Sequence, residues 1–239
     1  MEKCEAPVRT VKLGATRAEG GTRGKTFTVG GATCMPFHLW EGEMPNRPLV
    51  AMEVFDRVSE KYPAVLRKLY GEVLERPADM ARLCVEKYGA DLISVRLEGT
   101  HPEKGNRSVD ESVALVKKVL AAVDVPLLIT GHNHFDRHNE VLKAVAQACA
   151  GEGLLLNWVE QNNYKTLGGA ALAYGHSVVA QSPIDVNISK QLNILLGNME
   201  LKGDRIIMDP LTSAMGYGIE YTYSVMERIR LTGLGGADA

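Results

Sequence analysis

Residues 91–130 read DLISVRLEGTHPEKGNRSVDESVALVKKVLAAVDVPLLIT and hold two apolar runs separated by a loop and a helical pattern. The runs at 91–97 and 126–130 are continuous rather than alternating, which is typical of parallel strands buried on both faces. Between them Ser108 and Glu111 have the spacing of a helix capping box. Apolar residues then follow at helical spacing: Val109, Val113, Val116, Leu120 and Val123. This order predicts two parallel strands joined by a helix.

The same order of strand, loop and helix repeats along the chain. Further apolar runs are LVAMEVF from Leu49, LLLNWV from Leu154, SVVAQ from Ser177 and RIIMD from Arg205. Three later segments have apolar residues at helical spacing: Val141, Leu142, Val145 and Cys149; Ile188, Leu192, Leu195 and Met199; and Ile219, Tyr223, Met226 and Ile229. Six consecutive βα units predict an α/β fold with a parallel sheet.

Polar residues at the strand ends favour a barrel over a doubly wound sheet. A doubly wound dinucleotide-binding sheet would carry G-x-G-x-x-G after its first strand, and this motif is absent. A (β/α)₈ barrel instead collects functional residues at the carboxyl ends of many strands. Each run is followed by such a cluster: Glu53 and Asp56; Arg96, Glu98 and His101; Thr130, His132, Asn133 and His134; Asn157, Glu160 and Gln161; Gln181, Ser182 and Asp185; Asp209 and Thr212.

Length limits how much of a barrel the chain can form. Six units from residue 49 onward take up the available chain at roughly 31 residues each, as βαβ units do. We therefore expect a TIM-type barrel domain over residues 49–239 that lacks the last βα units and is open, with six strands. Residues 1–48 form an extension, in which strands at 11–13 and 26–29 predict a β-hairpin. The sequence Gly24-Lys25-Thr26 is not a phosphate-binding loop, because the required first glycine is replaced by Glu19.

Composition excludes several function classes. The chain has 239 residues, 27 basic and 29 acidic side chains and 45% hydrophobic residues, which argues against nucleic-acid and membrane surfaces. It has no apolar run of the roughly 18 residues that a membrane span needs, and its first ten residues do not resemble a secretory signal. The four cysteines form no C-x-x-C pair, so we expect free thiols, buried at Cys84 and Cys149, and no iron–sulfur cluster on this chain. These features predict a cytoplasmic protein.

Some strand-end residues allow two interpretations. His132 and His134 form an H-x-H pair that could bind zinc, but the further ligands of such a site are missing. Asn157 and Asp209 could hydrogen-bond a heterocycle, while Asp209-Pro210 could equally begin a helix. Asp185 precedes a helical pattern and favours a cap. No residue order indicates an activated nucleophile, so we assign no catalytic residue.

Several motifs resemble one family over most of the chain, from Val11 to Leu231. They are VKLGATR (11–17), GGTRGKT (20–26), EGTHP (98–102), GHNHF (131–135), NYKT (163–166), YGH (174–176), QSPIDVNISKQLN (181–193) and DPLTSAMGYGIEYTYSVMERIR (209–230). The family is the small subunit of the corrinoid iron–sulfur protein, also called the delta subunit of the acetyl-CoA decarbonylase/synthase complex.

The resemblance implies a non-catalytic TIM barrel that forms a heterodimer with a large subunit carrying the iron–sulfur cluster and the cobalamin domain. The corrinoid is then held between the two subunits. It carries a methyl group from methyltetrahydrofolate, through a separate methyltransferase, to acetyl-CoA synthase/CO dehydrogenase in the reductive acetyl-CoA (Wood–Ljungdahl) pathway. On this reading we expect the corrinoid to meet Glu98, Thr130, His132, Asn133, Asn157, Gln181, Asp185 and Asp209. The alternative is a pterin-dependent methyltransferase barrel that binds methyltetrahydrofolate itself through Asn157 and Asp209.

Overall fold

The computed structural model describes residues 4–236, and its centre is a six-stranded parallel sheet. The strands run in chain order across the sheet, each hydrogen-bonded to the next. They are β3 (Ala51–Phe55), β4 (Leu92–Arg96), β5 (Leu127–Thr130), β6 (Leu155–Val159), β7 (Ser177–Gln181) and β8 (Ile206–Asp209). The six predicted strands are thus confirmed. Residues 1–3 and 237–239, at the ends of the two segments expected from the sequence, lie outside the described residues.

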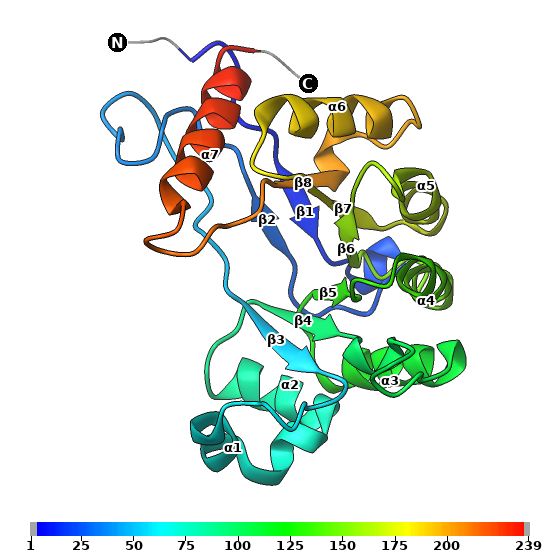
Figure 1. The fold of residues 1–239 in the computed structure, drawn as a ribbon. Helices are drawn as coiled ribbons and strands as arrows, with labels where there is room; N and C mark the ends of the chain where they lie inside the picture. The colour runs from blue at the N-terminus through cyan, green and yellow to red at the C-terminus, as the bar shows by residue number, and fades with distance from the viewer. Residues whose placement is uncertain (1–3, 237–239) are drawn as a thin grey trace.

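Helices follow the strands and cover one face of the curved sheet (Figure 1). They are α1 (Ala64–Tyr70), α2 (Pro77–Glu86), α3 (Val109–Ala122), α4 (Phe135–Ala148), α5 (Tyr164–Tyr174), α6 (Val186–Gly197) and α7 (Ile219–Leu234). A doubly wound sheet would have helices on both faces, so this arrangement is that of a barrel. Among the described residues β3 and β8 form the two edges of the sheet, and the barrel is open between them.

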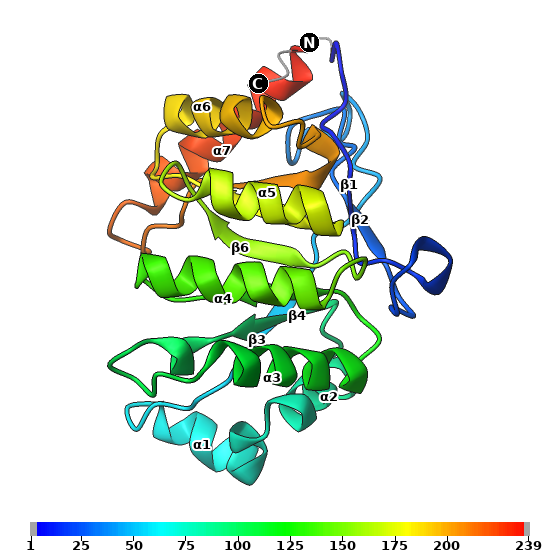
Figure 2. The same cartoon turned by 90° about the vertical axis from the view of Figure 1, so that its right-hand side faces the viewer.

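Alternation along the strands separates two clusters of apolar side chains. Outward-facing residues such as Ile93 and Ile129 are fully buried against the helices. Inward-facing residues near the strand starts pack instead on the predicted hairpin, formed by β1 (Val11–Leu13) and β2 (Phe27–Val29) in antiparallel pairing. Val11 and Leu13 meet Leu92, Leu155 and Val179 there. The hairpin therefore lies at the amino end of the barrel, as Figure 2 shows.

The start of α3 follows the predicted capping box. The Ser108 side chain accepts a hydrogen bond from the Glu111 backbone N–H at 3.3 Å, and the Glu111 carboxylate accepts one from the Ser108 N–H at 2.9 Å. Two otherwise unpaired N–H groups of the helix start are satisfied in this way. The helix consequently begins at Val109, immediately after the loop that follows β4.

The helix predicted from the last apolar stripe is confirmed as α7, but the stripe itself is largely exposed. Ile219, Tyr223 and Met226 are 41%, 51% and 55% exposed, and α7 instead buries Thr222, Val225 and Leu234. The helix follows the edge strand β8, and within residues 4–236 no further strand lies beside β8 for that stripe to cover. In α6, Leu192 of the stripe is buried together with Leu196, while Leu195 is half-buried.

The two cysteines that were expected to be buried, Cys84 and Cys149, are buried in the structure. Cys84 lies in α2, and Cys149 lies just beyond the end of α4; both are free thiols. Within residues 4–236, none of the helices has the length and apolar character needed to cross a membrane.

Candidate functional site

A band of polar side chains lies on the inner face of the sheet, where the strands end. Each strand contributes one residue, and we call the set the polar band: Glu53, Arg96, Thr130, Asn157, Gln181 and Asp209. The strand register places Arg96 beside Thr130 and Thr130 beside Asn157, and Gln181 beside Asp209. Because parallel strands end at the same edge, the six residues meet at the carboxyl mouth of the barrel.

Hydrogen bonds join neighbours within the polar band. Arg96 Nε donates to Glu53 Oε1 at 2.7 Å, and Asn157 Nδ2 donates to Thr130 Oγ1 at 3.2 Å. Gln181 Nε2 donates to Asp209 Oδ2 at 3.3 Å. Four of the expected contact residues are therefore brought onto one surface.

Three residues of this surface were missing from the expected contact set. They are Glu53, Arg96 and Ser94, whose Oγ lies 3.2 Å from Thr130 Oγ1. The alternation of polar and apolar residues in SVR and MEV was the signal that could have found them, since alternate residues of a strand face the same side.

An imidazole cluster, formed by His101, His132 and His134, lies beside the polar band on the loops after β4 and β5. The ring centroid of His101 is 5.0 Å from that of His132 and 5.9 Å from that of His134. His132 is only 3% exposed. Burial and the neighbouring imidazoles lower the pKa of His132 to about 4, so this ring is neutral at pH 7.

The loop after β4 is held down by a buried carboxylate. Asp56 Oδ1 accepts a hydrogen bond from the Gly99 N–H at 2.9 Å, and Oδ2 forms an ion pair with Arg107. Burial raises the pKa of Asp56, while these two partners lower it. Glu98, on the same loop, forms an ion pair with Lys104. The loop that carries Glu98 and His101 is therefore fixed to the end of β3.

A buried histidine of α4 packs against the loop that follows β5. His138, fully buried in α4, stacks on Trp158 at 4.8 Å between ring centroids, and its Nε2 lies 3.2 Å from the Trp158 carbonyl oxygen. A Cβ on Gly131 would lie 2.0 Å from His138 Nδ1, so only glycine fits there. Close contact with the His138 ring thus fixes the backbone that leads into His132.

We expect His138 to make the protein acid-sensitive. Burial lowers its pKa from 6.5 to about 4, so between these values the unfolded chain binds a proton that the folded protein does not. The resulting stability is complete above pH 6.5 and is lost as the pH falls towards 4, by about 2 kcal/mol at pH 5. Urea unfolding at pH 7.5 and at pH 5 measures this loss of stability. In His138→Phe the loss between the two pH values should be smaller by about 2 kcal/mol. An NMR titration of His138 with a midpoint above pH 6 would contradict this expectation.

The helix cap predicted at Asp185 is confirmed, while the helix start considered at Asp209 is not found there. Asn133 is exposed. Asp185 caps α6, where its Oδ1 accepts hydrogen bonds from the Asn187 and Ile188 N–H groups at 2.7 and 3.2 Å. Asp209 does not begin a helix, because α7 starts ten residues later at Ile219; its Oδ1 accepts instead from the Leu211 N–H at 2.9 Å.

The histidines of the described segment are not gathered with further acidic or thiol side chains into a metal-binding group. Over residues 4–236, the structure has no group of three or more His, Cys, Asp or Glu side chains placed to hold a metal ion. His176 lies at the other end of the barrel, where its two ring nitrogens hydrogen-bond the Leu154 N–H and the Ala146 carbonyl. The geometry therefore gives no support to the zinc interpretation of His132 and His134.

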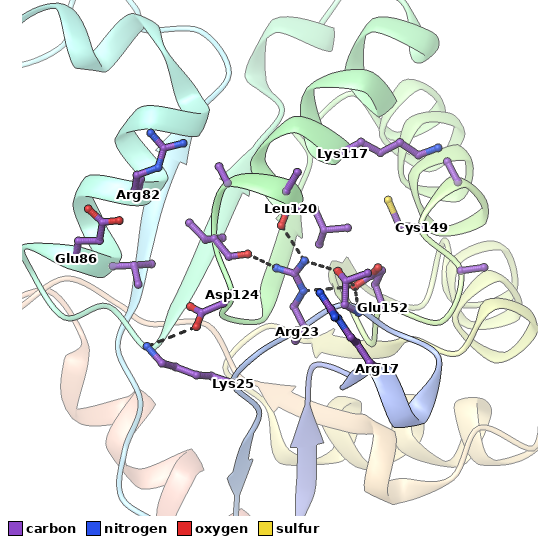
Figure 3. A pocket seen from close by; sticks show the side chains of 17 residues that line it. Arg17, Arg23, Lys25, Arg82, Glu86, Lys117, Leu120, Asp124, Cys149 and Glu152 are labelled. Carbon is purple, nitrogen blue, oxygen red and sulfur yellow. Dashed lines mark hydrogen bonds and ion pairs between the residues drawn. The ribbon is translucent and has the colours of Figure 1, made fainter.

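Two hollows lie at opposite ends of the barrel. A small one of about 330 Å³ touches the polar band and is lined by Glu53, Phe55, Arg57, Ser59, Tyr62, Arg96 and Glu98. A larger groove of about 1050 Å³ lies at the amino end, between the hairpin and the connections that lead into β5 and β6 (Figure 3). Its buried charges, Arg23 and Glu152, pair with each other and with the backbone. We therefore take the carboxyl mouth as the candidate site.

Fold and site together define an open α/β-barrel protein with a polar mouth and an amino end covered by a β-hairpin. Residues 10–239 match the family described as CO dehydrogenase/acetyl-CoA synthase delta subunit, and the chain belongs to that family.

Curated relatives agree with this assignment. The chain is 38% identical over 237 residues to the acetyl-CoA decarbonylase/synthase complex subunit delta of Archaeoglobus fulgidus, covering 98% of this chain and 52% of the relative. It is 37% identical over 230 residues to the subunit delta of Methanopyrus kandleri, covering 96% and 57%. It is 40% identical over 233 residues to subunit delta 1 of Methanosarcina thermophila, covering 97% and 53%. The chain thus spans about half the length of the curated relatives it matches.

Proposed function

We propose that the chain supplies the barrel of a methyl-carrying corrinoid protein in an acetyl-CoA decarbonylase/synthase system. The carboxyl mouth would cover the corrinoid, which a large subunit with an iron–sulfur cluster presents to it. The observation that carries the proposal is the polar band, six inward-facing residues from six adjacent strands, in a chain whose relatives are named as delta subunits of that complex.

The residues at the mouth fit such a group. Within the described part of the chain, His132 Nε2 and Asn157 Oδ1 are buried and have no hydrogen-bond partner. Leaving a buried polar atom unpaired costs about 1–3 kcal/mol. A macrocycle whose rim carries amide groups can supply both missing partners. When bound, the corrinoid would contribute a cobalt ion that carries the methyl group.

The protein's own part is binding and shielding. The polar band orients the rim of the macrocycle, and the loops that carry Glu98 and His132 exclude water from its face. Docking through polar loops is reversible, as it must be if a methyltransferase and acetyl-CoA synthase/CO dehydrogenase reach the same cobalt in turn. No residue of the mouth is assigned a catalytic role.

Reconstitution with a purified corrinoid-bearing large subunit tests the proposal. We expect a stable heterodimer with one corrinoid, measured by cobalt analysis and visible absorbance after gel filtration. His132→Ala and Asn157→Ala should each release the corrinoid about tenfold faster, since each removes one hydrogen-bonding group. Asn198→Ala, on an exposed helix end, is the matched control.

Failure to form the heterodimer, or equal corrinoid release from all variants, would contradict the proposal. Tight binding of methyltetrahydrofolate by the chain alone, lost in Asn157→Ala and Asp209→Ala, would instead support the pterin-dependent methyltransferase. Both residues lie in the polar band, which is why this second candidate is kept.

A further inference from the structure

The protonation pattern of the imidazole cluster is fixed by the backbone. His132 Nδ1 accepts a hydrogen bond from the His134 N–H at 3.1 Å, and His101 Nδ1 accepts one from the Glu103 N–H at 3.1 Å. A nitrogen that accepts a hydrogen bond carries no proton, and a neutral imidazole has one N–H. In each neutral ring the proton is therefore on Nε2.

This pattern makes the two rings donors rather than metal ligands. A metal bound at Nε2 needs the lone pair of that nitrogen and places the proton on Nδ1, where the backbone N–H groups already donate. His101 and His132 instead present two N–H groups, from rings that meet edge to face with centroids 5.0 Å apart.

One of these donors is buried without an acceptor. His132 Nε2 has no partner among the described residues, although the residue is 97% buried. The His101 and His134 rings pack around this ring, so access of a ligand to the nitrogen requires one of them to turn aside. A neutral buried N–H calls for an oxygen acceptor.

An unpaired acceptor lies on the neighbouring strand end. Asn157 Nδ2 donates to Thr130 Oγ1, which leaves Asn157 Oδ1 buried without a partner in the described chain. Thr130 and Asn157 are partners in the strand register, and His132 follows Thr130 by two residues. The mouth thus offers one unpaired donor and one unpaired acceptor on adjacent strands.

Two of the cations near the mouth, Arg96 and Lys104, are already paired, whereas Arg57 lies exposed beside them. Arg96 forms an ion pair with Glu53, and Lys104 forms one with Glu98. An anionic ligand group would find no unpaired positive charge on Arg96 or Lys104, and its oxygens would face the Asn157 carbonyl oxygen. A neutral group with both a carbonyl oxygen and an N–H satisfies both unpaired atoms.

We propose that His132 Nε2–H and Asn157 Oδ1 recognise a neutral carboxamide of the ligand, with His101 Nε2–H as a second donor to its carbonyl oxygen. The inference rests on the proposed function and extends it by naming the chemical group that the carboxyl mouth binds. Primary carboxamides surround a corrinoid ring, and a pterin carries the same pair of groups in its lactam. A carboxylate or a phosphate is rejected.

NMR of the chain labelled with ¹⁵N-histidine tests the proposal directly. Long-range ¹H–¹⁵N correlations at pH 7.5 should show the Nε2–H form for His101 and His132. Dicyanocobinamide, which keeps the ring carboxamides, should shift the His132 Nε2–H signal. Dicyanocobyrinic acid, which has carboxylates in their place, should bind at least tenfold more weakly. Tetrahydrofolate and zinc chloride are the other two probes.

A pair of variants separates the donor from the ring. His132→Gln keeps an N–H near the position of Nε2 and should retain most of the affinity for dicyanocobinamide. His132→Asn keeps only the acceptor towards the His134 N–H and should weaken binding about tenfold. His38→Gln, on an exposed loop of the extension, is the matched control and should change nothing.

Each outcome decides between the two proposals. Equal binding of the amide and carboxylate corrinoids, or a Nδ1–H form of His132, overturns the carboxamide inference and leaves the corrinoid function standing. A shift with tetrahydrofolate alone supports the carboxamide inference and rejects the corrinoid. Zinc coordination at His132 Nε2, or no response to any probe, overturns the inference.

Discussion

Arg23→Ala is expected to lower the free energy of unfolding by about 3–5 kcal/mol, the range found when a buried ion pair loses one partner. Arg23 is 4% exposed and lies in the loop of the hairpin. Its Nη1 donates to the Val123 and Val125 carbonyls at 2.6 and 3.2 Å, and its Nη2 donates to the Leu120 carbonyl at 2.7 Å. These carbonyls lie at and beyond the end of α3, where helical partners are lacking.

The same substitution would leave Glu152 as a buried charge. Arg23 Nε lies 3.4 Å from Glu152 Oε2, which also accepts hydrogen bonds from the Thr22 N–H and hydroxyl at 3.0 and 2.9 Å (Figure 3). One arginine therefore ties the hairpin loop to the connections before β5 and β6. Arg23→Lys should recover little, because an ammonium cannot reach three carbonyls and a carboxylate together.

Urea unfolding followed by circular dichroism measures this prediction. Arg17→Ala, an exposed arginine on the same groove, is the matched control and should stay within about 0.5 kcal/mol of the parent protein. Hydrogen exchange should show faster opening of residues 11–29 in Arg23→Ala only. A loss below 1 kcal/mol would show that the hairpin does not depend on this contact.

Asp56→Ala is the second large effect, again about 3–5 kcal/mol. The Asp56 side chain is fully buried, and its removal leaves both Arg107 and the Gly99 N–H without their partner. Arg107 also connects to α4, because Arg137 Nη2 donates to the Arg107 carbonyl at 2.7 Å. The variant should therefore loosen the whole segment 98–107 and, with it, His101.

Two measurements separate the local effect from general unfolding. Hydrogen exchange should rise in 98–107 more than in β5, and Asp56→Asn, which keeps an acceptor for the Gly99 N–H, should lose less stability than Asp56→Ala. Glu53→Ala, three residues earlier on β3, is the control, because its ion pair with Arg96 is partly exposed and such pairs contribute about 0–1 kcal/mol. Equal losses for Asp56→Ala and Glu53→Ala would rule out the anchoring role.

Local sequence patterns predicted the helices and strands of this fold, because the interactions that form these elements act between residues close in sequence. The continuous apolar run at 91–97 and the Ser108–Glu111 box act over a few residues, and both are found where the sequence places them. The stripe of α7 predicted the helix correctly but could not show that the stripe stays exposed. Spacing shows which side of a helix is apolar, but a neighbouring element decides whether that side is buried, and β8 is an edge.

The site could be predicted only in part for the same reason. Strand-end position placed Thr130, Asn157, Gln181 and Asp209 correctly on one surface. The contact between Asp56 and Arg107 joins residues 51 positions apart, and that between Arg23 and Glu152 joins residues 129 apart. Which ring nitrogen of His132 carries the proton depends on one hydrogen bond, from the His134 backbone N–H. None of these contacts leaves a trace in residue spacing.

The hairpin at the amino end affects which end of the barrel is open to other molecules. Val11 and Leu13 pack against Leu92, Leu155 and Val179 and cover the inner face of the sheet at its amino end, which leaves the carboxyl mouth as the uncovered end of that face. On the proposed function, the molecules that bind at the mouth would bind there one at a time. The dissociation rate of each would then limit how soon the next could bind.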